Sequence, residues 1–140
     1  MLLYGRSGKH IADNSPTLLP QELQLDGNPM PALPSTLGRC ATLEVLSVQA
    51  MGDPIQALPL SISGCENLVV IRAARNDIFD LPDCFGSICR VEYLDFNENQ
   101  LESLPPSFLN CDRLKVLLLR KNQLRELFKG TSNLYALHTL

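Results

Sequence analysis

Apolar residues return along this chain in a phrase that repeats about every 23 residues. Each copy carries two apolar residues separated by one variable residue, then a turn position three residues later, and then a Leu-Pro pair. These pairs begin at Leu33, Leu58, Leu81 and Leu104, with offsets of 25, 23 and 23 residues. The apolar pairs and turn positions are Leu23, Leu25 and Asn28; Leu46, Val48 and Met51; Ile71, Ala73 and Asn76; Leu94, Phe96 and Asn99; and Leu117, Leu119 and Asn122. Self-similarity at such a period indicates an array of stacked repeats.

Each copy predicts the same two elements. The alternation of apolar and variable residues is typical of a short strand with one face turned inward. After the Leu-Pro pair, apolar residues follow in steps of three, which fits a short helix or 3₁₀ segment packed on the strands. Proline suits the first turn of such a segment because it has no N–H to leave unpaired. The sequence therefore predicts an α/β solenoid, a curved array with short parallel strands on its concave face and short helical or 3₁₀ segments on its convex face.

The copies divide the chain into repeat units after an irregular lead-in. The lead-in covers 1–19, and the array covers 20–140 as units 20–42, 43–67, 68–90, 91–113 and 114–136 with a partial unit 137–140. In the fifth unit Phe128 and Thr131 replace the usual proline and apolar residue, which predicts a looser outer segment. A solenoid needs a polar cap over its last apolar edge, and residues 137–140 supply none. We therefore expect either a longer parent protein or a second chain over that end, with self-association as one form of the latter.

The turn position is asparagine in four of the five units, at Asn28, Asn76, Asn99 and Asn122. An asparagine amide donates to and accepts from backbone groups that a bending chain leaves unpaired, so these side chains are predicted to hold the turns. The second unit has Met51 in this place and two extra residues within 52–54. We expect a local bulge there, with Asp53 supplying the missing bonds.

Variable residues beside the inward ones fall into columns, because equivalent positions of successive units lie on adjacent strands about 4.8 Å apart. Several of them are apolar although the core does not need them, which is typical of a protein-binding patch, and Tyr and Arg often anchor such contacts. The predicted partner-binding residues are Val45, Val70, Arg72, Tyr93, Asp95, Val116, Leu118 and Arg120. The simpler alternative is that valine and tyrosine occur here because they suit any strand.

Opposite charges also meet in these columns. Arg72 and Asp95 are one unit apart, and the column two positions beyond the strands runs Arg75, Glu98, Lys121. We expect both sets to form cross-strand ion pairs, each worth about 0–1 kcal/mol at a surface. Such pairs could serve partner binding, or they could simply keep the surface soluble.

Composition narrows the possible functions. A net charge of −3 and an isoelectric point near 5.3 give no electrostatic footprint for nucleic acid. The longest aliphatic runs are four residues, far short of a membrane span. Cys40, Cys65 and Cys111 occupy a position that holds Ile88 in the third unit, which indicates small buried free cysteines. We predict a cytoplasmic chain with no membrane insertion and no nucleic-acid partner.

The repeats lack the combinations of residues that catalysis usually requires. The two histidines are His10, in the lead-in, and His138, in the partial unit, so no Ser/His or Cys/His pair can form within the array. Acidic residues are scattered without a pair fixed by spacing, as solvated surface charge would be. Cys84 and Cys89 lack a partner Cys or His cluster and give little sign of a metal site. The sequence predicts no enzyme, no metal and no cofactor.

Two units match a known consensus along their whole strand and turn. Residues 91–101 and 114–124 follow the pattern L-x-x-L-x-L-x-x-N-x-L, with Val91 in the first place of the former. Over residues 20–140 the chain resembles the leucine-rich-repeat superfamily. Its 23-residue Leu-Pro units resemble the intracellular Ras-group class, which includes the Ras/Raf scaffold, Ras-suppressor and Scribble–Erbin proteins.

This resemblance implies a non-catalytic module that binds another protein on its concave face, as a scaffold or adaptor in intracellular signalling. Similar arrays also precede the catalytic domains of GTPase-kinases, adenylate cyclases, a deadenylase and ubiquitin ligases. The alternative is therefore a substrate-targeting or regulatory repeat region of a larger enzyme.

Overall fold

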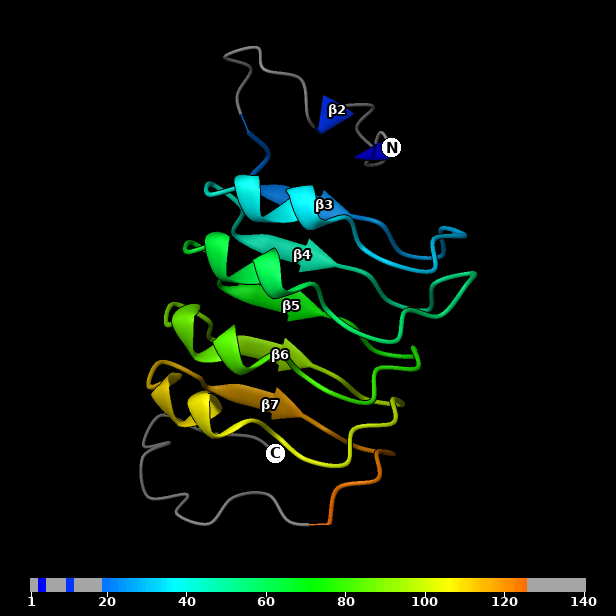
Figure 1. Ribbon diagram of the computed structural model, residues 1–140, viewed down its shortest axis with the longest axis vertical. Coiled ribbons are helices and arrows are strands. Elements are labelled where there is room, and N and C mark those ends of the chain that lie inside the picture. The colour runs from blue at the N-terminus through cyan, green and yellow to red at the C-terminus, as the bar shows by residue number, and fades with distance from the viewer. Residues whose placement is uncertain (1–2, 5–9, 12–18, 126–140) are drawn as a thin grey trace.

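The computed structural model describes residues 3–4, 10–11 and 19–125. Five short parallel strands lie side by side in sequence order and form one sheet (Figure 1). They are β3 (Glu22–Gln24), β4 (Val45–Ser47), β5 (Val70–Arg72), β6 (Tyr93–Asp95) and β7 (Val116–Leu118). Within the lead-in, β1 (Leu3–Tyr4) pairs antiparallel with β2 (His10–Ile11) in a separate two-stranded sheet.

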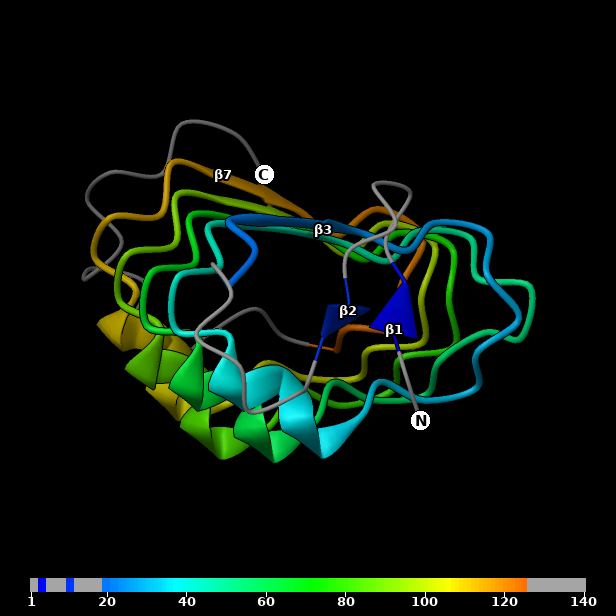
Figure 2. The same cartoon turned by 90° about the horizontal axis from the view of Figure 1, so that it is seen from above.

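A 3₁₀ helix follows each of the first four strands of the array and lies on the opposite side of the solenoid from the sheet (Figure 2). These helices are η1 (Ser35–Arg39), η2 (Leu60–Gly64), η3 (Asp83–Ser87) and η4 (Pro106–Asn110). The predicted fold class, a curved solenoid with strands on one face and 3₁₀ segments on the other, is confirmed. Among the described residues no helix is long and apolar enough to cross a membrane.

The proline of each Leu-Pro pair precedes its 3₁₀ helix rather than lying in the first turn as expected. Pro34 is extended, with ψ 147°, and its carbonyl accepts the first i+3 bond, from the Leu37 amide at 3.0 Å. The Cys40 amide then donates to the Leu37 carbonyl at 2.9 Å. This bond pattern places every third side chain on the same side, so the three-residue apolar step selects a 3₁₀ helix over an α-helix.

Within residues 19–125, thirty apolar side chains form one continuous core between the sheet and the helices. The inward strand residues Leu46, Ile71 and Leu94 are fully buried, as the alternation predicts. Phe85 stacks on Phe108 with ring centroids 5.4 Å apart. It also meets the edge of Phe96 at 6.1 Å. The larger rings of the third and fourth units thus fill the core that smaller residues fill in the first two.

The helices of neighbouring units approach so closely that a side chain cannot fit between some of them. A Cβ on Gly86 of η3 would lie 2.2 Å from the backbone oxygen of Ser107 in η4. Gly38 stands in the same relation to Ser61. Glycine is required at these two places because any side chain would collide with backbone.

Asparagine side chains join consecutive units at the turns. The Asn99 Nδ2 donates to the Ala73 carbonyl of the preceding unit at 2.9 Å and to the Phe96 carbonyl of its own unit at 3.1 Å. Its Oδ1 accepts the Ile78 amide at 3.1 Å. Asn76 and Asn122 repeat this arrangement one unit to either side. The Asn28 Nδ2 donates to the Leu25 carbonyl at 2.6 Å. These bonds lie at the turns where the sequence places the asparagines, and their contribution to stability stays a prediction.

In the second unit, backbone hydrogen bonds replace those of the missing asparagine, and Asp53 does not. Met51 is buried, and Asp53 is exposed without a hydrogen bond to any described residue. The Met30 amide, whose equivalents bond an asparagine oxygen, donates instead to the Asn28 carbonyl at 2.9 Å. The Gly52 amide donates to the same carbonyl at 3.0 Å. The expected substitution by Asp53 is therefore wrong, because a local turn in 28–30 satisfies these groups first.

The residue before each turn position adopts a left-handed backbone conformation. Gly27 has φ 71°, but the equivalent residues of the other four units are not glycine: Ala50 (46°), Arg75 (58°), Glu98 (56°) and Lys121 (58°). Their amides extend the sheet bonding past the strands, as when the Ala50 amide donates to the Ala74 carbonyl at 2.9 Å. An L-residue in this region costs about 1–2 kcal/mol, so four units carry strain that the sequence pattern did not reveal.

We expect Asn99→Ala to lower the free energy of unfolding by about 1–3 kcal/mol, because it leaves buried carbonyls and an amide without partners. Urea denaturation followed by circular dichroism measures this change. Asn110→Ala, at an exposed site at the end of η4, is the matched control and should change stability by only a few tenths of a kcal/mol. Equal effects of the two substitutions would contradict the role of Asn99 in joining the units.

Ala50→Gly should raise the free energy of unfolding by about 0.5–1 kcal/mol, since relief of left-handed strain exceeds the entropy that glycine loses on folding. Ala57→Gly, at an exposed position bridged to Asp80, should instead lower it by a similar amount. Thermal unfolding of the two variants gives the comparison. A stability loss in both would show that the backbone at residue 50 is unstrained.

Candidate functional site

The outward residues of the strands form continuous rows across the sheet. Each strand pairs with the next without offset, so Val45 lies beside Val70, Val70 beside Tyr93, and Tyr93 beside Val116. All four are half-buried, while their inward neighbours are fully buried. We call this set the valine–tyrosine row. The predicted column is thereby confirmed as a spatial row, and its role in binding stays a prediction.

The second row lies between the inward residues and contains Arg72, Asp95 and Leu118 side by side. Arg72 and Leu118 are half-buried, and Arg120 is exposed beyond the end of β7. The Arg120 amide donates to the Asn97 Oδ1 at 2.7 Å. All eight predicted partner-binding residues therefore lie on the strand face of the solenoid or at its immediate edge.

The expected ion pair between Arg72 and Asp95 does not form. The Arg72 guanidinium lies over the Tyr93 ring, 5.9 Å from its centroid, in a cation–π contact. Asp95 turns toward the end of its own strand, where its Oδ1 accepts the Asn97 amide at 3.0 Å. Arg72 contacts Tyr93 and Asp95 accepts the Asn97 amide, so the two charged residues lie on adjacent strands without forming an ion pair.

The second expected ladder is present. Glu98 bonds Arg75 at 3.8 Å and Lys121 at 3.2 Å, and so links three consecutive units. These side chains are largely exposed to solvent, so each pair contributes about 0–1 kcal/mol. The ladder therefore shapes the charge of the surface more than it stabilises the fold.

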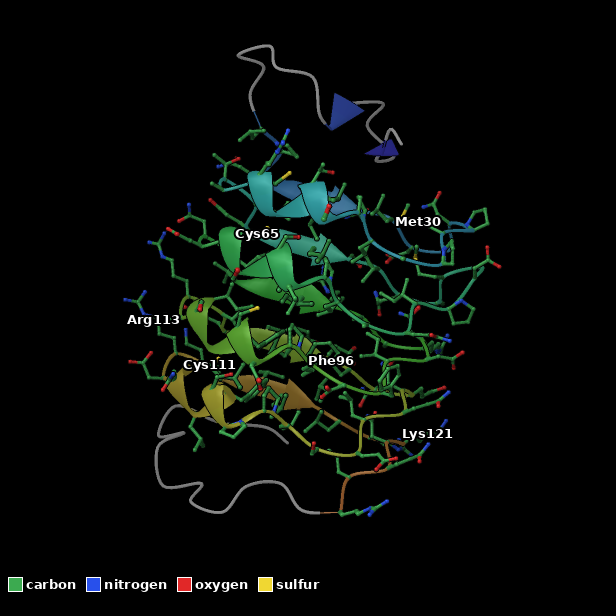
Figure 3. All side chains as sticks on the ribbon, in the orientation of Figure 1. Met30, Cys65, Phe96, Cys111, Arg113 and Lys121 are labelled. Atoms are coloured by element: carbon green, nitrogen blue, oxygen red, sulfur yellow. The ribbon has the colours of Figure 1, made fainter. Side chains whose placement is uncertain are left out.

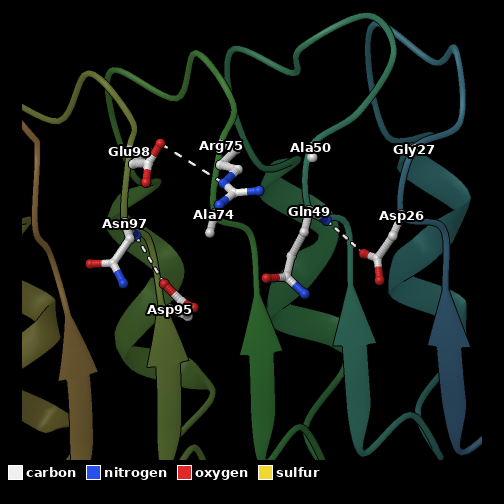
Figure 4. Close-up of a pocket in the computed structure, with 9 residues that line it drawn as sticks. All are labelled: Asp26, Gly27, Gln49, Ala50, Ala74, Arg75, Asp95, Asn97 and Glu98. Atoms are coloured by element: carbon white, nitrogen blue, oxygen red, sulfur yellow. Dashed lines mark hydrogen bonds and ion pairs between the residues drawn. The ribbon is translucent and has the colours of Figure 1, made fainter.

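A hollow of about 530 Å³ lies where the strands end, on the same face. Figure 4 shows it, and its lining is Asp26, Gly27, Gln49, Ala50, Ala74, Arg75, Asp95, Asn97 and Glu98. Ala74 stands between the longer side chains of Gln49 and Asn97, and this difference in length creates the space. The sequence contains an indication of the hollow, because Ala74, Ala50 and Gly27 are small residues in columns that otherwise hold long polar ones.

Three cysteines are buried in the core beside the 3₁₀ helices; Figure 3 labels Cys65 and Cys111. Burial raises the pKa of the Cys40 thiol. Burial, with a smaller contribution from Cys40, raises the pKa of Cys65 to about 11. Burial, then Cys89 and Asp112, raises the pKa of Cys111 to about 12. These thiols stay protonated near neutral pH and are poor nucleophiles. Within the part of the chain that the structure describes, no three His, Cys, Asp or Glu side chains are grouped to hold a metal.

Comparison with known proteins points to one kind of repeat. The sequence model of the family described as Leucine Rich Repeat matches residues 90–111. No curated protein matches the chain. Among solved structures, a leucine-rich-repeat protein of Leptospira interrogans superposes with a TM-score of 0.77 at 28% identity, over 84% of this chain and 29% of that protein.

Two plant receptor ectodomains are also similar. The leucine-rich-repeat ectodomain of the receptor kinase SOBIR1 from Arabidopsis thaliana matches 99% of this chain and 75% of its own length, with a TM-score of 0.75 at 17% identity. The ectodomain of GASSHO1/SCHENGEN3 from the same plant, solved in complex with CASPARIAN STRIP INTEGRITY FACTOR 2, matches 84% of this chain and 14% of its own, with a TM-score of 0.64 at 28% identity. The chain therefore has the leucine-rich-repeat fold and spans less than a third of the Leptospira protein.

The buried thiols predict a loss of stability in alkali. A raised pKa means that the folded state holds the thiol proton more tightly, so this contribution is complete below the ordinary pKa of 9.0 and is lost as the pH rises through about 11 for Cys65. We expect the free energy of unfolding to fall over that interval, and to fall less in Cys65→Ala. Cys84→Ala, at a partly exposed thiol that does not affect the buried ones, is the control. An alkaline slope that Cys84→Ala reduces and Cys65→Ala does not would contradict this assignment.

Proposed function

We propose that this chain is a non-catalytic module that binds a protein partner on the strand face of the solenoid. The valine–tyrosine row carries the proposal. It presents half-exposed apolar side chains, with Arg72 held over Tyr93, in a continuous band. Aromatic residues and arginine are enriched where protein interfaces have their energetic centres.

The similar structures support protein binding by this fold. The GASSHO1/SCHENGEN3 ectodomain is described in complex with another molecule, CASPARIAN STRIP INTEGRITY FACTOR 2. This chain covers 14% of that protein's length. The likeness therefore supports binding by repeats of this kind, and it does not identify the partner of this chain.

Within this function we further propose a cytoplasmic scaffold or adaptor of the Ras-group type, acting in intracellular signalling. Units of 23 residues with Leu-Pro pairs support that subtype. Five free cysteines support a reducing compartment, because oxidising compartments favour disulfides. The alternative, a targeting region of a larger enzyme, would use the same strand face. The proposed self-association, and the expected loosening at Phe128 and Thr131, involve residues 126–140, which lie outside the described residues.

Tyr93→Ala should reduce capture of a protein partner from an extract of the source cells by about tenfold, as expected for an aromatic anchor, with little change in stability. The measurement is affinity capture on the immobilised chain, with each retained protein quantified by mass spectrometry. Phe79→Ala is the control, because Phe79 is an aromatic residue with a solvent-accessible ring, 55% exposed, that lies outside the strands. Proteins retained by Tyr93→Ala and lost with Phe79→Ala would move the binding surface away from the valine–tyrosine row.

A further inference from the structure

We propose that the hollow at the strand ends receives an arginine or lysine side chain of the protein partner. This inference rests on the proposed function, because the hollow lies on the same strand face as the valine–tyrosine row. It goes further in assigning a chemistry to one part of the partner.

The floor of the hollow is apolar and shallow. Ala74 is 8% exposed and presents only a methyl group between Gln49 on one side and Asn97 on the other. Ala50 adds a second methyl group from the neighbouring unit, and Figure 4 shows the Arg75 side chain between the two alanines. The aliphatic stems of lysine and arginine pack on such surfaces while their charged heads stay near water.

The rim carries an excess of negative charge. Asp26, Asp95 and Glu98 line the hollow together with one cation, Arg75. Three carboxylates against one guanidinium give the lining residues a net charge of −2, and Lys121, which pairs with Glu98 at 3.2 Å from outside the lining, reduces it to −1. The remaining negative charge favours a basic over an acidic or neutral side chain in the hollow.

The carboxylates are not equally engaged. Glu98 is shared between Arg75 and Lys121. Asp26 is held in place by the Ser47 hydroxyl, at 2.8 Å from Oδ1, and by the Gln49 amide at 2.7 Å. Asp95 accepts only the Asn97 amide, on Oδ1. Its second oxygen has no partner among the residues that the structure describes, so Asp95 is the carboxylate best placed to meet an incoming cation.

The test uses the chain as it stands and a defined probe, the peptide acetyl-Gly-Arg-Gly-amide. Its matched control replaces arginine with citrulline, which keeps the shape and loses the charge. We expect the arginine peptide to shift the backbone amide resonances of Gly27, Ala50, Arg75, Asn97 and Glu98 in an NMR titration. The citrulline peptide should bind about fivefold more weakly, as expected for loss of an exposed charge pair. Added salt should weaken only the arginine peptide.

Asp95→Asn should weaken the arginine peptide by about fivefold while keeping an oxygen for the Asn97 amide. Asp80→Asn is the matched control. Asp80 is exposed where Asp95 is half-buried, but its Oδ1 likewise accepts a backbone amide, that of Leu81 at 2.9 Å, and it lies outside the hollow. We expect Asp80→Asn to leave the affinity unchanged.

Three results would overturn the inference: equal binding of the two peptides, resonance shifts away from the hollow, or no shifts at all. Dependence of partner capture on Tyr93 would survive each of them, so the proposed function would stand alone. Conversely, specific binding of arginine in the hollow with capture indifferent to Tyr93 would support this site and reject the valine–tyrosine row.

Discussion

The structure depends on how the chain satisfies its backbone where it leaves each strand. The amide and carbonyl groups there point into a dry interior, and an unpaired buried group costs about 1–3 kcal/mol. Asn99, only 6% exposed, satisfies three of these groups with one side chain and does so across two units. Its bonds therefore fix the stacking of the units as well as the turn. Core packing alone would leave neighbouring units free to slide along each other.

That stacking determines the register, and the register determines the surface. Because the strands pair without offset, a residue chosen once per unit becomes a row across the sheet. The same regularity has a cost. The residue before the turn must adopt a positive φ in every unit, and Ala50 does so without the freedom of glycine. The interior bonds are strong enough to impose this strain on four units.

The strands, their partners and the buried cysteines could be predicted from sequence, because each follows from a side chain's place in the period. Other features could not. Arg72 turned to Tyr93 instead of Asp95, since several contacts within reach of a long side chain differ little in energy. Backbone hydrogen bonds to the Asn28 carbonyl replace the side-chain bonds that Met51 cannot make. The sequence of residues 28–30 does not reveal this. The hollow arises from relative side-chain lengths around Ala74, a property of neighbours that single columns do not show.

The strand face thus has two different parts, an apolar row at the starts of the strands and an acidic hollow at their ends. Ala74 lies four residues after Val70 and two residues beyond the end of β5, about 13 Å away in extended chain. An extended segment laid across the strands covers one part and not the other. An α-helix, about 10–12 Å across with its side chains, reaches both. A partner that uses the whole face therefore runs along the strands or presents a helix or a folded surface, and in the proposed binding mode it carries an apolar side and a basic side chain at its margin.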